Sequence, residues 1–257
     1  MYKCRTAVIV GSMKNVLALA FMLTAVFGVR AEGLPDWMLP LREAVYEQVL
    51  SADEVRPLYL DALSAAEQNA SGASLNLAVS QAEYFMGRAL LFEERNPEAR
   101  THFSEGLRLA QLTVQQAPSA QAWALRGDNL AHLIQASNWT FAMANGLDVE
   151  KFANSALAID GRNAAAKYLI ASRWVFAPSP FNNINRGIDM MQAILRENNM
   201  EKDDLFNVNS AIGWGYLQQR KYEEAKPYIR RAIEVYPTNV WAAELLQAAE
   251  SGRKPRL

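Results

Sequence analysis

The sequence predicts an all-α protein, a right-handed α-solenoid of about four helix pairs with further N-terminal helices and a C-terminal capping helix. A recurring pattern is the main observation. A small residue is followed three positions later by a large apolar one at four places, and the small residues are 40, 44 and 42 positions apart: Gly87 with Leu90, Gly127 with Leu130, Ala171 with Trp174, and Gly213 with Tyr216. Residues i and i+3 share a helix face, so each pair presents a gap at the small residue beside a protruding large side chain, and a neighbouring helix can pack against both. The second observation is that no segment alternates between apolar and polar residues as a strand does.

Helices are expected along the chain from residue 39 to residue 250, and capping residues and helix breakers mark several of their ends. Ser51, Asp53 and Asp148 are candidate N-caps. Glycine and proline mark the stops at Gly72, Gly161, Pro178, Pro180 and Pro237. The expected helices are 39–50, 53–69, 73–93, 97–116, 120–143, 149–159, 163–176, 184–197, 203–219, 222–235 and 239–250.

The clearest helix pair lies at 211–239. The stretch 220–222 interrupts the apolar pattern and Pro237 cannot continue a helix, which excludes one continuous helix. Two antiparallel helices explain the pattern, because Ala225 and Ala232 then lie where the two backbones approach each other closely.

This segment resembles a tetratricopeptide repeat. The residues that match the family's pattern are Ile212, Gly213, Tyr216, Ala225, Ile229, Ala232 and Pro237. The segment 80–106 resembles a second copy, whereas the two units between them depart from the pattern through a longer first helix and an insertion at 177–185. The resemblance covers 73–250 and implies stacked helix pairs with a concave binding surface. The longer spacing is also typical of solenoids of the HEAT kind, and that alternative stays open.

The first 31 residues have the pattern of a secretory signal peptide. A basic Lys14 precedes an apolar run at 16–29, and small residues precede a cleavage site after Ala31. Met13 is an alternative start, and an uncleaved anchor is the alternative to cleavage. We therefore expect an exported, periplasmic protein with N-terminal helices in 32–72, a repeat domain at 73–250 and a flexible tail at 251–257.

The charge and cysteine content restrict the partners of this mature chain. Loss of residues 1–31 removes four basic residues and leaves 22 basic against 27 acidic ones, which argues against nucleic acid and against membrane contact other than through an uncleaved signal. The only cysteine, Cys4, precedes the cleavage site, so neither a disulfide nor a lipid-anchoring cysteine is expected.

The sequence carries no recognisable catalytic motif. His102 and His132 have no metal-ligand partner at i+3 or i+4, and carboxylate pairs such as Asp203-Asp204 are explained by helix starts. Glycine-rich phosphate loops and nucleophile elbows are not found. We therefore expect a protein that is not an enzyme and binds neither cofactor nor metal.

The resemblance implies which residues line the concave groove, since the first helix of each pair forms its inner wall. Carried onto this chain, the implied groove residues are Tyr84, Arg88, Phe92, Asp128, His132, Tyr168, Ser172, Phe176, Trp214, Leu217 and Gln218. The aromatic members are suitable anchors for a peptide or an amphipathic helix. The alternative for Phe92, Phe176 and Trp214 is packing against the next repeat or a chain end.

The first functional expectation is therefore an exported, non-enzymatic adaptor that binds a protein or peptide segment in this groove. The alternative is a small-molecule binding or transporter-accessory protein, with a small apolar ligand or a transporter component as partner. A self-assembling scaffold is the weaker alternative.

Overall fold

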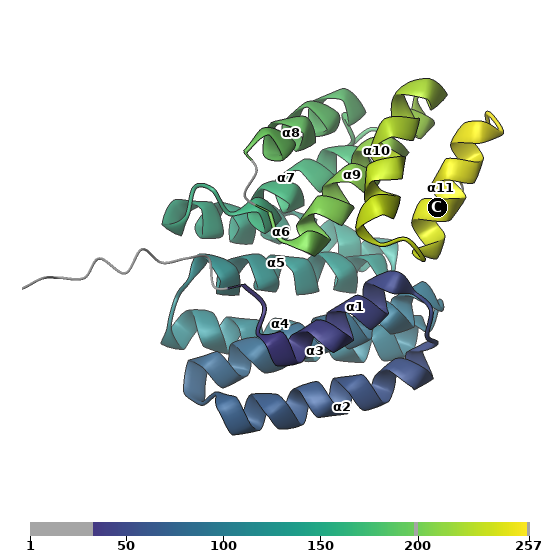
Figure 1. Ribbon diagram of the computed structural model, residues 1–257. Helices are drawn as coiled ribbons and strands as arrows, with labels where there is room; N and C mark the ends of the chain where they lie inside the picture. Colours follow the sequence, from purple (N-terminus) through teal and green to yellow (C-terminus); the bar gives the residue numbers. More distant parts are fainter. Residues whose placement is uncertain (1–32, 198–199, 256–257) are drawn as a thin grey trace, which may run out of the picture. The chain divides into compact units, whose positions relative to one another are not determined.

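The computed structural model describes residues 33–197 and 200–255 (Figure 1). The described residues from Leu34 onward form one compact unit. The predicted signal peptide lies outside the described residues. No helix within the described ranges combines the length and the apolar character that crossing a membrane requires.

The described part of the chain is all-α, as predicted. It begins with a short 3₁₀ helix, η1 (Asp36–Met38). The α-helices that follow are α1 (Leu39–Glu47), α2 (Ala52–Asn69), α3 (Gly72–Phe92), α4 (Asn96–Gln116), α5 (Ala120–Gln135), α6 (Trp139–Ile159), α7 (Ala164–Phe176), α8 (Ile184–Arg196), α9 (Lys202–Gln218), α10 (Tyr222–Val235) and α11 (Val240–Glu250).

Polar N-caps start many of these helices. Ser51 forms a capping box with Glu54 at the start of α2, which confirms Ser51 as a cap. Asparagine caps recur later in the chain, where Asn163 accepts a hydrogen bond from the Ala166 amide and Asn239 accepts one from the Ala242 amide. Each such cap satisfies an amide that the first helical turn leaves without a partner.

The predicted boundary between the fifth and sixth helices was wrong. The sequence predicts helices at 120–143 and 149–159, whereas α5 ends at Gln135 and α6 runs without a break from Trp139 to Ile159. Asn138 is the actual N-cap, because its side chain accepts a hydrogen bond from the backbone amide of Phe141. Asp148 is an internal residue of α6, paired with Lys151 at 2.6 Å.

The helices pack in sequential pairs, α1 with α2, α3 with α4, α5 with α6, α7 with α8, and α9 with α10, followed by α11. Each odd-numbered helix also contacts the odd-numbered helices before and after it. The odd-numbered helices thus form one continuous layer, the inner helices, and the even-numbered helices pack beside them (Figure 1). This arrangement is consistent with a helical repeat.

The small residues of the repeated pattern lie where partner helices come close together. A Cβ at Gly87 would lie 2.7 Å from the ring of Phe103 on α4, and one at Gly213 would overlap Ile229 on α10. At Gly127 the side chain that fills the space belongs to a different element, because it is Leu169 of the next inner helix, α7. The close approach predicted from the spacing is therefore present in the α3–α4 and α9–α10 pairs.

Helix α1, at the start of the row of helices, contacts α9 and the segment that follows α10. The ring of Tyr46 stacks on Tyr236 with centroids 4.8 Å apart and lies edge-on to Phe206 at 5.6 Å. The side-chain amide of Asn239 donates to the Tyr46 carbonyl at 2.6 Å, and Thr238 bonds to Glu47. These contacts span up to 193 positions of sequence, and they place the first helix and the last helices in one hydrophobic core.

Candidate binding site

Six polar side chains from four inner helices form a group that we call the polar cluster. Its members are Arg88 of α3, Asp128 and His132 of α5, Tyr168 of α7, and Asp203 and Asp204 of α9. All six are partly exposed, and the charges of Arg88, Asp128 and Asp204 each act on the hydroxyl of Tyr168. Side chains that are far apart in sequence are therefore close in space.

Arg88 has an aromatic setting. Its Nη1 atom donates to the hydroxyls of both Tyr46 and Tyr84, and its guanidinium carbon lies 4.2 Å from the Tyr46 ring centroid. A guanidinium over a ring face is stabilised by the cation–π interaction. The ion pairs of the described residues do not include Arg88, so this cation is held by tyrosines and not by a carboxylate.

His132 has a defined tautomer. Its Nδ1 lies 2.9 Å from the carbonyl oxygen of Asp128, and since a carbonyl can only accept, Nδ1 carries the proton. Its ring packs edge-on to Tyr84 at 5.1 Å. Burial and the positive charge of Arg88 lower the pKa of His132 to about 3, so the ring is neutral at pH 7 and its Nε2 atom can accept a hydrogen bond.

The three carboxyl groups of the cluster are harder to ionise than ordinary aspartates. Burial raises the pKa of Asp128 to about 7, although the charge of Arg88 opposes this. Burial also raises the pKa of Asp203 against the opposing charge of Arg42. For Asp204, burial and repulsion from Asp203 and Asp128 raise the pKa well above its usual value. The cluster therefore contains more acidic groups than cations, and ionising these carboxyl groups costs free energy.

Ion pairs between α1 and the start of α9 lie next to the cluster. Arg42 contacts Glu43 at 2.8 Å and Asp203 at 3.9 Å, and Lys202 pairs with Glu43. Of the three aspartates, Asp203 thus has a cation nearby, whereas the ion pairs of the described residues include neither Asp128 nor Asp204.

The structure brings together part of the groove implied by the sequence. Tyr84, Arg88, Asp128, His132 and Tyr168 lie in or directly against the polar cluster.

The remaining groove residues lie elsewhere or are packed. The ring of Trp214 is buried and packs on Phe176 with centroids 4.9 Å apart, and Leu217 is fully buried. Phe92 is 45% exposed, but it lies beside residues of α1 and α2 at the end of α3. Ser172 donates to the Leu169 carbonyl, and Gln218 is partly exposed.

The sequence analysis missed the contributions of Asp203, Asp204 and Tyr46. The two aspartates were explained as a helix start, although extending the inward stripe of Trp214 by about three helical turns toward the N-terminus reaches them. Tyr46 carried no such signal, because it precedes the repeated pattern.

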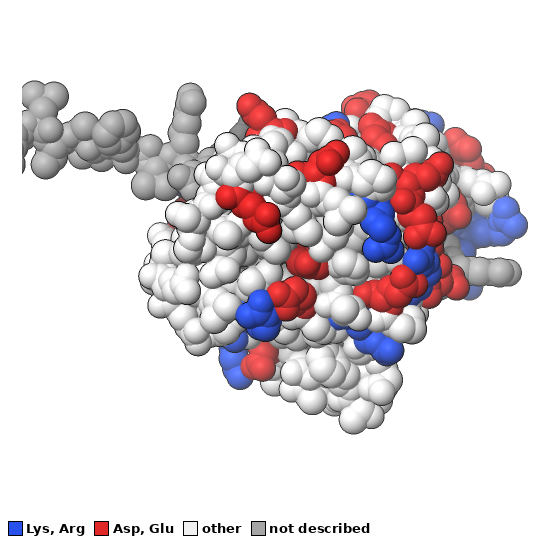
Figure 2. All heavy atoms as spheres, turned by 90° about the horizontal axis from the view of Figure 1, so that it is seen from below, with Lys and Arg blue, Asp and Glu red and all other residues white. Residues whose placement is uncertain are grey.

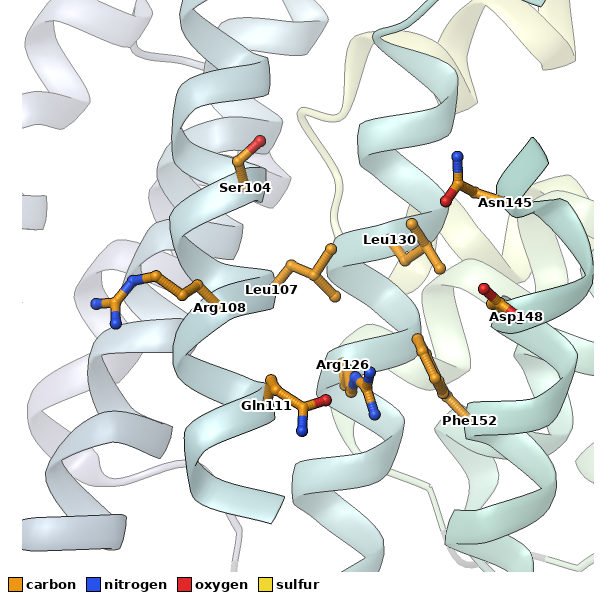
Figure 3. A pocket seen from close by; sticks show the side chains of 9 residues that line it. All are labelled: Ser104, Leu107, Arg108, Gln111, Arg126, Leu130, Asn145, Asp148 and Phe152. Atoms are coloured by element: carbon orange, nitrogen blue, oxygen red, sulfur yellow. The ribbon is translucent and has the colours of Figure 1, made fainter. Parts of the chain in front are cut away.

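A hollow lies on the other side of α5 from the polar cluster, between α4, α5 and α6 (Figure 3). Its volume is about 350 Å³, and the Arg126 guanidinium carbon lies 3.7 Å from the Phe152 ring centroid. Gln111 faces Arg126 across the hollow, whereas Arg108 points away from it (Figure 3). Gln111 Oε1 and Arg126 Nε are buried without a hydrogen-bond partner among the described residues.

Comparison with known proteins gives no family for this chain, since neither a protein-family model nor a curated protein matches it. Among the described residues, no group of three His, Cys, Asp or Glu side chains is placed to hold a metal ion. The chemistry of the polar cluster itself is suited to hydrogen bonding and charge pairing.

Proposed function

We propose that this chain is an exported, non-enzymatic protein of the tetratricopeptide kind, a right-handed α-solenoid that binds a small polar molecule against its inner helices. The observation that carries this proposal is the polar cluster, in which Arg88, Asp128 and Asp204 lack ion-pair partners among the described residues. Charges that are partly removed from water cost free energy unless an opposite charge or hydrogen bonds compensate them. A bound ligand would supply the missing partners.

Binding of an extended peptide along the inner helices has less support. Peptide recognition depends on exposed aromatic or aliphatic anchors. Of the expected anchors, Trp214 and Leu217 are buried, and α1 lies beside Phe92. A compact ligand fits these contacts better than a chain segment does.

Native mass spectrometry of the full chain from its source cell tests the proposal. We expect a small bound molecule on the wild-type protein and on Arg126→Gln, and its loss from Arg88→Gln. Arg126 is a matched control because it is also a partly exposed arginine stacked on an aromatic ring, on the opposite side of α5. A wild-type protein that carries no small molecule, or an Arg88→Gln variant that retains it, would contradict the proposal.

A protein partner is the second candidate, favoured by an apolar stripe on α6. Trp139, Met143 and Leu147 recur every four residues and are 57%, 55% and 61% exposed, and Phe181 packs against Trp139. Figure 2 shows a face on which acidic side chains predominate over basic ones, which suits a protein partner better than nucleic acid.

A photoreactive residue in place of Trp139, with Arg231 as the control position, tests this second candidate. A discrete adduct from position 139 alone would support a protein partner, and adducts between copies of the chain would support a self-assembling scaffold. Equal labelling from both positions would remove the support for either.

A further inference from the structure

The polar cluster leaves one edge of the Arg88 guanidinium open. Nη1 donates to the hydroxyls of Tyr46 and Tyr84, and among the described residues no group accepts a hydrogen bond from Nε or Nη2. This Nε–Nη2 edge is the fork with which arginine binds a carboxylate through two parallel hydrogen bonds. Because Tyr46 and Tyr84 fix the guanidinium plane, the fork is held in place before any ligand arrives.

Two aspartates of the same cluster lack a positively charged partner. Asp128 lies on α5 and Asp204 on α9, and neither is paired with a lysine or arginine of the described residues. Asp204 is affected by the charge of Asp128, so the two carboxyl groups are near enough to repel each other. A positively charged group between them would offset this repulsion.

A ligand with a single charge can pair with Arg88 or with the aspartates, but not with both. An anion on Arg88 would lie within the field of Asp128 and Asp203. A cation beside the aspartates would leave the fork of Arg88 without an acceptor. A molecule with both charges, at a separation matching the distance between α3 and the aspartates, satisfies both.

We propose that the polar cluster binds a small zwitterion, with its carboxylate on the Nε–Nη2 edge of Arg88 and its ammonium group between Asp128 and Asp204. The Tyr168 hydroxyl and the free Nε2 of His132 supply further hydrogen bonds. This inference rests on the proposed function, and it names the chemical class of the ligand. The weak acidity of Asp128 agrees with it, because a nearby ammonium group would stabilise the ionised carboxylate.

Calorimetric titration of the full chain tests this inference. The probes are the common L-amino acids and the ω-amino acids from glycine through β-alanine and γ-aminobutyrate to ε-aminocaproate, which vary the separation of the two charges. The matched controls are propionate and butyrate, which lack the ammonium group, and propylamine and butylamine, which lack the carboxylate. We expect at least one amino acid to bind, and its single-charge analogues to bind at least about tenfold more weakly.

The variants locate the site. Arg88→Gln and Asp128→Asn should each weaken binding by about tenfold or more, whereas Arg126→Gln should leave it unchanged. If Arg88→Gln does not fold, Asp204→Asn and Arg88→Lys, which keeps the charge but not the fork, replace it. An amino acid that binds equally well to these variants would overturn the inference.

The titration also separates this inference from the function on which it rests. If no amino acid binds but native mass spectrometry finds another small molecule that is lost in Arg88→Gln, the zwitterion is refuted and small-molecule binding stands. If neither experiment finds a ligand, both fail.

Discussion

Replacing Tyr46 by alanine should remove the contacts that join the first helix to the last ones. The side chain is fully buried, stacks on Tyr236 at 4.8 Å and lies edge-on to Phe206 at 5.6 Å. Its hydroxyl accepts hydrogen bonds from Arg88 and from the Asn207 amide, the latter at 3.0 Å. The substitution therefore removes an aromatic core residue and leaves two donors without their acceptor.

The expected cost follows from these contacts. Truncation of a large buried aromatic residue lowers the free energy of unfolding by about 3–5 kcal/mol, so we expect about 4 kcal/mol for Tyr46→Ala. Tyr46→Phe keeps the ring contacts and should cost about 1–2 kcal/mol, because only the hydroxyl is lost. The control is Tyr228→Ala on α10, where a partly exposed ring has its centroid 5.8 Å from that of Tyr216 and its hydroxyl accepts a hydrogen bond from Gln192. It should cost about 1–2 kcal/mol.

Urea unfolding of the full chain, followed by circular dichroism and extrapolated linearly to water, measures these differences. The order of cost should be Tyr46→Ala first, with Tyr46→Phe and Tyr228→Ala well below it. If Tyr46→Ala costs no more than Tyr228→Ala, the contact between the two ends does not stabilise the fold and the reasoning is refuted.

Three further predictions concern other contacts. Gly87→Ala should lower the free energy of unfolding by about 1–3 kcal/mol through overlap with a fully buried ring, whereas Gly146→Ala, with open space around the new methyl group, should raise it by about 0.5–1 kcal/mol; thermal unfolding compares them. Asn239→Ala loses both a helix cap and the bond to α1, so it should cost more in urea unfolding than Asn163→Ala, which loses a cap alone; equal costs would contradict this. Because the folded-state pKa of Asp128 is raised, the native state binds more protons than the unfolded state between about pH 4 and pH 7, and wild-type stability falls as the pH rises through that window. Asp128→Asn should therefore gain stability relative to wild type over this range, and a difference that does not change with pH would be evidence against the buried carboxyl.

The helix pairs could be predicted from the sequence because their signals are local. The glycine at position 87 and the aromatic residue at position 103 meet across one helix pair, and the spacing between them is short and repeated near Gly213 and Ile229. The failure at α6 has a local cause too. Asn138 is a strong cap that was overlooked, whereas Asp148 resembled one but lies inside a continuous helix.

The candidate site was only partly predictable. The inward stripe predicted from the sequence contains Arg88 and Asp128, which both lie in the polar cluster, because the period of a helix determines which residues share a face. The participation of Tyr46 could not be derived in the same way. It depends on how the row of helices curves and on contacts between residues more than 150 positions apart, such as that between Asn207 and Tyr46. The small rotation between successive helix pairs accumulates along a repeat, and a local sequence pattern does not reveal the total rotation.

Nuclear magnetic resonance of the arginine side chains tests most directly whether the polar cluster is the ligand site. The Nε–Hε resonance of Arg88, assigned by comparison with Arg88→Lys, is followed while a low-molecular-weight extract of the source cell is added to the full chain. Our account predicts that the Arg88 resonance shifts and that the resonance of Arg126, on the other side of α5, does not. An unchanged Arg88 resonance, or a shift confined to Arg126, would contradict it.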